Sequence, residues 1–212
     1  ESGHACRDAG DADAALAAAR AFLLAHDTDP FNKWEAGRAL AKDVLIRMIT
    51  DEEAPADSLI DGLGHVLGDE TLDPAFRALC LRLPSEDDLA QTLHDAGRTP
   101  DPERIAAERT ALAKTIARQL QKPLTATYDA MATERPFSPD AAAAGQRALR
   151  LAFLVLFNKN DNGTRAASLF AMADNMTESH GALACLIDGG RGAREIAAFY
   201  DRWSGNRLVI DK

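Results

Sequence analysis

Three asparagines and a glycine in the second half of the chain have the spacing of a calcium-binding loop. Asn158, Asn160, Asn162 and Gly163 match positions 1, 3, 5 and 6 of such a loop. That loop also needs early carboxylates and a bidentate glutamate at position 12, where this chain has Leu169. Neutral amides do not offset the dehydration of a divalent cation, so we interpret the segment as a polar turn.

Gly62, Gly64 and Gly68 superficially resemble the glycine-rich loop that binds the phosphates of a dinucleotide. The last spacing differs from that motif, and no strand pattern precedes it. Instead, residues 58–67 carry apolar side chains at helical spacing. We therefore predict a helix here, with glycines that allow close contact between helices.

The five histidines are the residues best suited to holding zinc or moving protons. They are His4, His26, His65, His94 and His180. No H-E-x-x-H motif occurs and no two histidines are four residues apart, so no single helix can supply a zinc site. The serines likewise lack the G-x-S-x-G turn that exposes a nucleophile. We assign no catalytic residue, no metal ligand and no cofactor to this chain, and its substrate-binding residues stay unknown. The histidines are expected at the surface or at helix caps.

The composition of the 212-residue chain favours helices. Hydrophobic residues make up 46% of it and aromatic residues 6%, with much alanine and leucine and few β-branched runs. A formal net charge of −9 argues against a nucleic-acid partner, because phosphate binding requires a basic face. No apolar run reaches the length of a membrane span, so we expect no membrane contact and a cytoplasmic protein.

The three cysteines, Cys6, Cys80 and Cys185, are far apart and lack C-x-x-C spacing. This pattern predicts neither a disulfide framework nor a zinc knuckle. We expect Cys80 and Cys185 to be buried as small apolar side chains.

Helix starts recur along the chain as an N-cap residue followed by proline. These pairs are Asp29-Pro30, Asp73-Pro74, Asp101-Pro102 and Ser138-Pro139. After the second pair the expected buried stripe is Phe76, Leu79, Cys80 and Leu83. Ser85 and Asp88 resemble a capping box for another short helix.

Longer helices are expected over 102–122, where Pro123 must kink or end the helix, and over 139–157. Three shorter ones follow near 164–173, 178–188 and 192–203. Short polar links make consecutive helices pack antiparallel. The predicted fold is therefore all-α, with antiparallel helix pairs in a solenoid-like, superhelical array.

Five ordered blocks of the sequence resemble the C-terminal helical domain of bacterial aminopeptidase N, the zinc-dependent alanyl aminopeptidase family. They are residues 22–37 (FLLAHDTDPFNKWEAG), 81–86 (LRLPSE), 137–140 (FSPD) with the following alanines, 173–177 (ADNMT), and 199–203 (FYDRW) leading to 208–212 (LVIDK). Each block alone is weakly specific, but the ordered set is not. The resemblance implies that residues 21–212 are the first part of that helical domain, truncated at its C-terminal end, and it leaves residues 1–20 as an N-terminal segment of unclear assignment.

The resemblance also implies a parent enzyme that removes N-terminal residues from peptides with one zinc ion in its catalytic domain. The motifs that hold this zinc and the substrate amine are absent from the present sequence, so no catalytic residue is carried over and this part alone is expected to be inactive. In that family the helical domain covers the active-site cleft and restricts entry to peptides. The implied partners are the catalytic domain of the same chain and peptide substrates. The alternative is a stand-alone helical-repeat scaffold that binds a protein partner.

Overall fold

The computed structural model describes residues 2–131 and 137–210, and the side chains within them from residue 12 to residue 209. Within this part the chain forms helices and no strand, which confirms the all-α prediction. The helices are α1 Ser2–His26, α2 Pro30–Ile49, α3 Asp57–Gly68, α4 Pro74–Cys80, α5 Glu86–Asp95, α6 Pro102–Gln119, α7 Gln121–Ala130, α8 Ala141–Asn158, α9 Thr164–Met172, α10 Met176–Asp188, α11 Ala193–Trp203 and α12 Arg207–Ile210.

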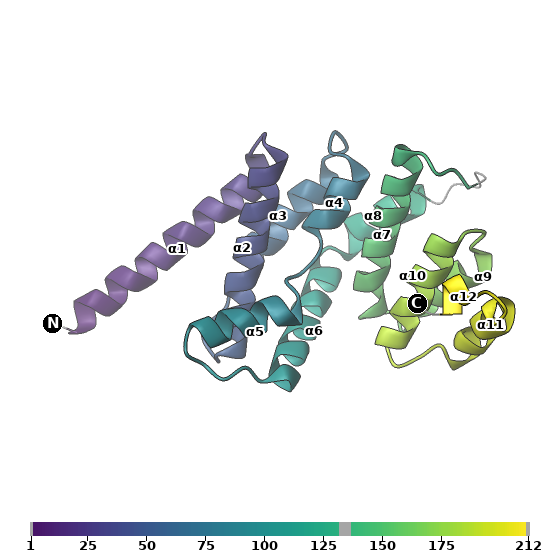
Figure 1. Ribbon diagram of the computed structural model, residues 1–212. Helices are drawn as coiled ribbons and strands as arrows, with labels where there is room; N and C mark the ends of the chain where they lie inside the picture. The colour runs from purple at the N-terminus through teal and green to yellow at the C-terminus, as the bar shows by residue number, and fades with distance from the viewer. Residues whose placement is uncertain (1, 132–136, 211–212) are drawn as a thin grey trace.

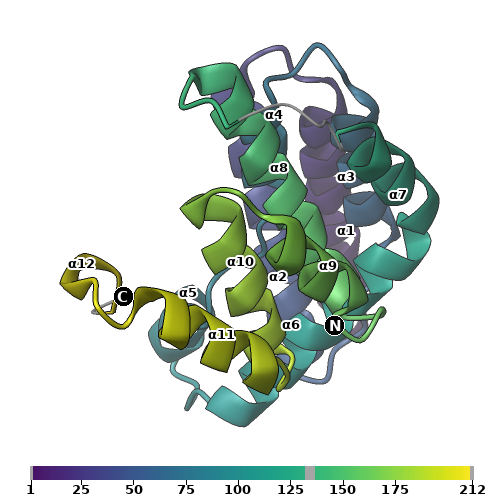
Figure 2. The ribbon, with the colours of Figure 1, turned by 90° about the vertical axis from the view of Figure 1, so that its right-hand side faces the viewer.

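The helices follow one another along an elongated array that begins with the projecting helix α1 (Figure 1). Seen end-on, α8, α9 and α10 lie in front of the N-terminal helices, and α11 and α12 extend to one side (Figure 2). The core is continuous from Leu24 on α1 to Leu186 on α10. No helix in the described ranges is both long enough and apolar enough to cross a bilayer.

Three of the four predicted helix starts are confirmed. The carboxylates of Asp29, Asp73 and Asp101 each accept two backbone N–H bonds from the first turn of α2, α4 and α6. At Asp29 these bonds come from Phe31 at 2.8 Å and Asn32 at 3.0 Å. The following proline has no N–H to lose, so it suits the first helical position.

The fourth predicted start, Ser138-Pro139, is wrong by two residues. Helix α8 begins at Ala141, and its N-cap is Asp140, whose carboxylate accepts from the backbone N–H of Ala143 at 2.9 Å. The Ser138 hydroxyl donates to the same carboxylate. Both of these bonds hold the pKa of Asp140 below its ordinary value, the serine bond being the larger cause. Serine therefore supports the cap here and does not form it.

The buried stripe predicted for α4, Phe76, Leu79, Cys80 and Leu83, is also partly wrong. Leu79 is 40% exposed, whereas Ala78 and Leu81 are buried. Helix α4 lies against α8 at Gly145, where an added Cβ would come 3.3 Å from the backbone nitrogen of Ala75. This close approach sets the orientation of a helix too short to follow its own apolar pattern.

Gly62 of α3 serves close helix packing, as predicted, whereas a Cβ added to Gly68 at the end of the helix would meet no atom within 4 Å. Leu24 of α1 is fully buried between Gly37 of α2 and Gly62 of α3. A Cβ built on Gly37 would lie 2.8 Å from a Leu24 methyl carbon, and one built on Gly62 would lie 2.6 Å from the other. Lys33 is buried beside them, and its ammonium donates to the carbonyls of Leu24 at 3.0 Å and Ala25 at 2.9 Å. Its charge thereby stabilises the C-terminal end of α1.

The helix predicted over 102–122 is followed by a second helix, as expected, but it ends three residues early, at Gln119, so the break lies before Pro123 and not at it. Helix α7 starts at Gln121, which leaves Leu120 as the joint between the two helices. Pro123 is the third residue of α7 and has no N–H to donate to the preceding turn.

Candidate functional site

A groove of about 580 Å³ opens between α6, α8, α10 and the connection from α4 to α5. Its apolar wall is the α8 face that carries Ala148, Leu151, Ala152 and Val155. Val155 is 48% exposed, so the groove is open to solvent. The volume lies within the range that proteins use for small ligands and peptide side chains.

Three contacts, spaced along the helices, hold the two helical walls α8 and α10 together. Leu151 packs on Gly181, where an added Cβ would lie 2.7 Å from a Leu151 methyl carbon. Toward one end, the guanidinium of Arg150 pairs with the carboxylate of Glu178 at 3.1 Å, and both side chains are largely buried. Toward the other, the Asn158 amide donates to the carbonyl of Cys185 at 2.6 Å.

The partners in these three contacts advance together along both sequences, so α8 and α10 run in the same direction. Helix α9 lies between them in the chain. The width of the groove is therefore fixed by side chains that were not predicted to interact.

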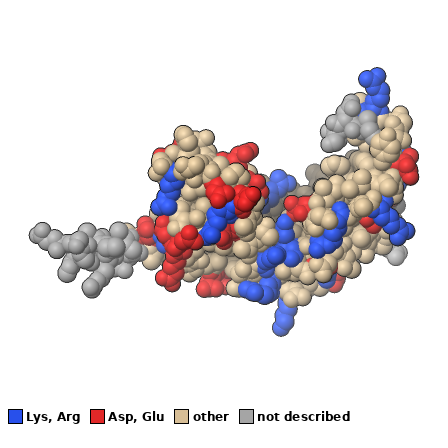
Figure 3. Space-filling view, turned by 90° about the horizontal axis from the view of Figure 1, so that it is seen from below, with Lys and Arg blue, Asp and Glu red and all other residues tan. Residues whose placement is uncertain are grey.

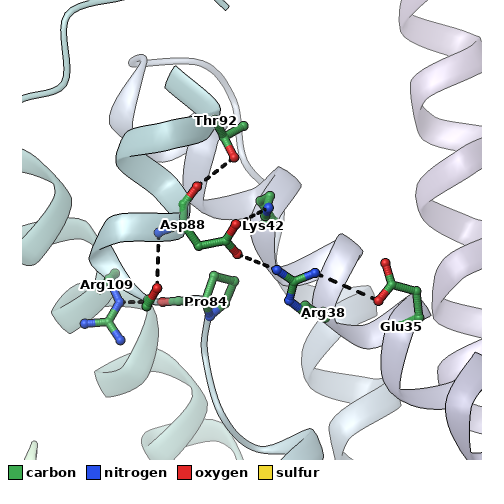
Figure 4. A network of polar contacts seen from close by, with 8 residues as sticks. Glu35, Arg38, Lys42, Pro84, Asp88, Thr92 and Arg109 are labelled. Carbon is green, nitrogen blue, oxygen red and sulfur yellow. Dashed lines mark hydrogen bonds and ion pairs between the residues drawn. The ribbon is translucent and has the colours of Figure 1, made fainter. Parts of the chain in front are cut away.

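The α4–α5 connection, which forms the opposite wall, is held by a polar network (Figure 4). Asp88 of α5 accepts from Lys42 at 2.6 Å and from Arg38 at 2.9 Å, both on α2. Its own N–H donates to the Ser85 hydroxyl at 3.1 Å, which confirms the serine half of the predicted capping box. Arg109 of α6 donates to the carbonyl of Pro84 at 2.7 Å.

The rim of the groove is polar and partly basic. Lys159 pairs with Asp188 at 2.6 Å, and Arg109 pairs with Glu86 at 3.2 Å. Arg82 is exposed and pairs with no carboxylate among the described side chains, those of residues 12–131 and 137–209. The view from below shows a hollowed face on which lysine and arginine gather over the middle and toward the C-terminal helices, while aspartate and glutamate gather on the side nearer α1 (Figure 3).

The Cys185 thiol lines the groove but is not activated. Burial, followed by the nearby Asp188 carboxylate, raises its pKa to about 11. Burial likewise raises the pKa of the Cys80 thiol to about 11. Both thiols are therefore protonated at neutral pH. Cys185 is buried, as predicted, whereas Cys80 is only half-buried. Cys6 lies outside the residues whose side chains are described.

Residues 17–212 match the family described as a domain of unknown function (DUF3458_C) with ARM repeats. The chain belongs to this family. ARM repeats are stacked helical units, and the match fits the predicted solenoid-like array.

Two relatives of this ARM-repeat domain are named aminopeptidase N. The protein of Caulobacter vibrioides is 38% identical over 200 residues, and that of Escherichia coli is 30% identical over 200 residues. The alignments cover 91% and 90% of this chain but only 23% and 22% of those relatives. The chain thus corresponds to a helical part of an aminopeptidase, and the resemblance to the C-terminal helical domain of aminopeptidase N is confirmed.

A solved structure with the same fold is that of Legionella pneumophila aminopeptidase A in complex with aspartic acid. The match covers 88% of this chain and 23% of the Legionella pneumophila chain, with a TM-score of 0.74. The sequence identity is 19%, so this likeness concerns the fold alone.

The residues considered for calcium binding form the turn of the ARM-repeat domain that leads into α9. Asn158 is buried and bonded to Cys185, and Asn162 and Gly163 adopt left-handed backbone angles, with φ of 57° and 79°. Leu169, at the position of the required glutamate, is buried in the core. Across the described residues, no group of three or more His, Cys, Asp or Glu side chains could hold a metal ion.

The groove was not predicted because its walls come from four separate segments of the domain. Neither α8 nor α10 carries a sequence motif for binding. The small residues Gly181 and Ala184 on α10 were the only sequence signal for the groove. Small residues at this spacing equally indicate ordinary helix packing.

Proposed function

We propose that this chain is the non-catalytic helical portion of a zinc metalloaminopeptidase and that it covers the active-site cleft and gates the entry of peptides. The supporting observation is the open apolar groove with a partly basic rim, found in a domain whose relatives are aminopeptidases. An extended peptide can place apolar side chains in such a groove while its backbone and charges contact the rim.

The zinc ion of this proposal belongs to the catalytic domain of the parent enzyme. The relatives are much longer than this chain, which leaves room for such a domain. The chain itself supplies no chemical step, and in isolation it is expected to hydrolyse no substrate. Its partners would be the catalytic domain of the same chain and peptides. The proposal further places the parent enzyme in the cytoplasm and treats residues 21–212 as the helical domain, with 1–20 as a preceding segment.

Substituting Val155 in the full-length enzyme tests whether the groove contributes to peptide selection. Val155→Asp puts a charge on the groove wall at a position that is already half exposed, so the fold should tolerate it. Losing the burial of one valine by a bound peptide costs about 1–2 kcal/mol, equivalent to a roughly 5- to 30-fold loss in kcat/KM. An aminoacyl anilide has no downstream residues, so its kcat/KM should stay unchanged.

The control is Met172→Asp, which places the same charge on an exposed apolar residue outside the groove. It should leave both substrates unaffected. Equal losses for peptide and anilide with Val155→Asp would mean that the substitution acts on the catalytic domain or the fold. An unchanged rate for peptides of any length would remove the groove from the gating proposal.

A further inference from the structure

Two histidines from separate helices meet on the surface where α1 packs against α3. The ring centroids of His26, the last residue of α1, and His65 of α3 are 5.3 Å apart, with the ring planes inclined at 55°. The rings are therefore neither stacked nor coplanar. Both residues are exposed, which leaves the space around them open to a ligand from solution.

The separation of the two rings fits a metal ion bound between them. A ligating imidazole nitrogen lies about 2.0–2.1 Å from a divalent zinc-like cation, which places the ring centroid about 3.2 Å from the ion. Two such rings at a tetrahedral angle have centroids about 5.2 Å apart. The observed centroid separation of 5.3 Å agrees with this value, so a shared ion requires only that the two exposed side chains turn a nitrogen toward it.

The backbone around the pair is firmly held. Leu24, two residues before His26, is wedged against Gly62, three residues before His65. The ammonium of Lys33 fixes the last turn of α1 through the carbonyls of Leu24 and Ala25. Phe22, one turn before His26, packs against its ring with centroids 4.9 Å apart. Pre-organised ligands lose little conformational freedom on binding.

The surroundings favour a cation. His65 lines an open hollow together with Asp61 and Asp69. The pKa of Asp69 is lowered, first by the hydrogen bond from the Thr71 hydroxyl and then by that from its backbone N–H, so this carboxylate stays charged. Neither carboxylate completes a set of three ligands with the histidines in the described structure. The remaining coordination positions would be taken by water.

We propose that His26 and His65 form a two-imidazole site for a divalent first-row transition metal, of the Zn²⁺, Ni²⁺ or Cu²⁺ class, that links α1 to α3. Imidazole is a preferred ligand for these ions. With two protein ligands the site is weaker than a structural zinc centre and responds to the concentration of metal. Its occupancy ties the end of α1 to the neighbouring helix.

Nickel titration of the full-length, zinc-loaded enzyme tests the proposal, because Ni²⁺ then reports on sites other than the catalytic one. Isothermal calorimetry should show that His26→Asn and His65→Asn each weaken the binding of one Ni²⁺ at least tenfold. The matched control His94→Asn, at an exposed histidine on α5, should bind nickel like the unmodified enzyme. The thermal midpoint should rise with Ni²⁺ in the unmodified enzyme and in the control only.

Thermal midpoints measured without nickel show whether each variant is folded, since exposed histidines tolerate asparagine. Nickel affinities that are unchanged in both His26→Asn and His65→Asn would overturn the proposal. So would a loss in only one of them, because the ion must be shared. An unmodified enzyme that binds no Ni²⁺ would leave the pair as an aromatic contact only.

Discussion

Replacing Gly62 by alanine tests how closely α1 and α3 are packed. The added Cβ would lie 2.6 Å from one methyl carbon of Leu24 and 3.0 Å from its Cγ. Leu24 cannot move toward α2, because its other methyl carbon is already packed against Gly37, only 2.8 Å from where a Cβ on that glycine would lie. The helix preference of alanine contributes about 1 kcal/mol of stability, while overpacking a core costs about 1–3 kcal/mol. We therefore expect a net loss in the free energy of unfolding, of up to about 2 kcal/mol.

Gly68 provides a matched control at the end of the same helix. A Cβ there has no atom within 4 Å, so Gly68→Ala should be neutral or stabilising. The difference between the two variants, about 1–3 kcal/mol, then reports the packing cost itself, with the helix preference largely cancelled. Urea unfolding, followed by the far-ultraviolet circular dichroism of the helices, gives the free energy of unfolding of both variants.

A double substitution tests whether contact with the Leu24 side chain causes the loss of stability in Gly62→Ala. Leu24→Ala alone should cost about 2–5 kcal/mol through the cavity that it leaves. Combined with Gly62→Ala, it should cost less than the sum of the two single changes, because the new methyl group occupies part of that cavity. Equal urea midpoints for Gly62→Ala and Gly68→Ala, or strictly additive losses in the double variant, would refute the tight contact.

Two further predictions concern the buried side chains Lys33 and Cys185. Lys33→Met keeps the aliphatic stem but leaves the carbonyls of Leu24 and Ala25 without their donor, so unfolding in urea should show a loss of about 1–3 kcal/mol; an unchanged midpoint would contradict the proposed capping of α1. Cys185, with its pKa raised from 9.0 to about 11, should react with iodoacetamide at pH 8 roughly a hundredfold more slowly in the folded chain than in urea, measured by mass spectrometry of the labelled peptide. Similar rates in both states would show that the thiol is not buried.

Much of the fold could be predicted because its signals are local. An aspartate followed by proline supplies a hydrogen-bond acceptor and a preset backbone angle within two residues, and three such pairs begin helices as expected. The fourth failed because Ser138 and Asp140 compete for the same role. The carboxylate is the stronger acceptor, and the serine hydroxyl donates to it.

Burial along α4 could not be read from its own seven residues. A longer helix buries its apolar face because that face carries most of its packing energy. In α4 the close approach to Gly145 of α8 determines the orientation, and Leu79 is left exposed as a consequence. Gly145 lies about 70 positions from α4 in the sequence, and helix propensities describe only local preferences. They therefore cannot predict this contact.

The two candidate sites depend on the same kind of long-range contact. His26 and His65 were set aside because no two histidines share one helix face, and that argument is sound only for ligands on a single helix. Glycine at position 62 allows Leu24 to bring α1 close to α3, and the two rings then meet. Glycine at position 181 likewise brings α10 against Leu151 and sets one wall of the groove. In both places a glycine that carries no chemistry decides where the functional side chains lie, so in a helical array the close-contact glycines are the residues to examine first.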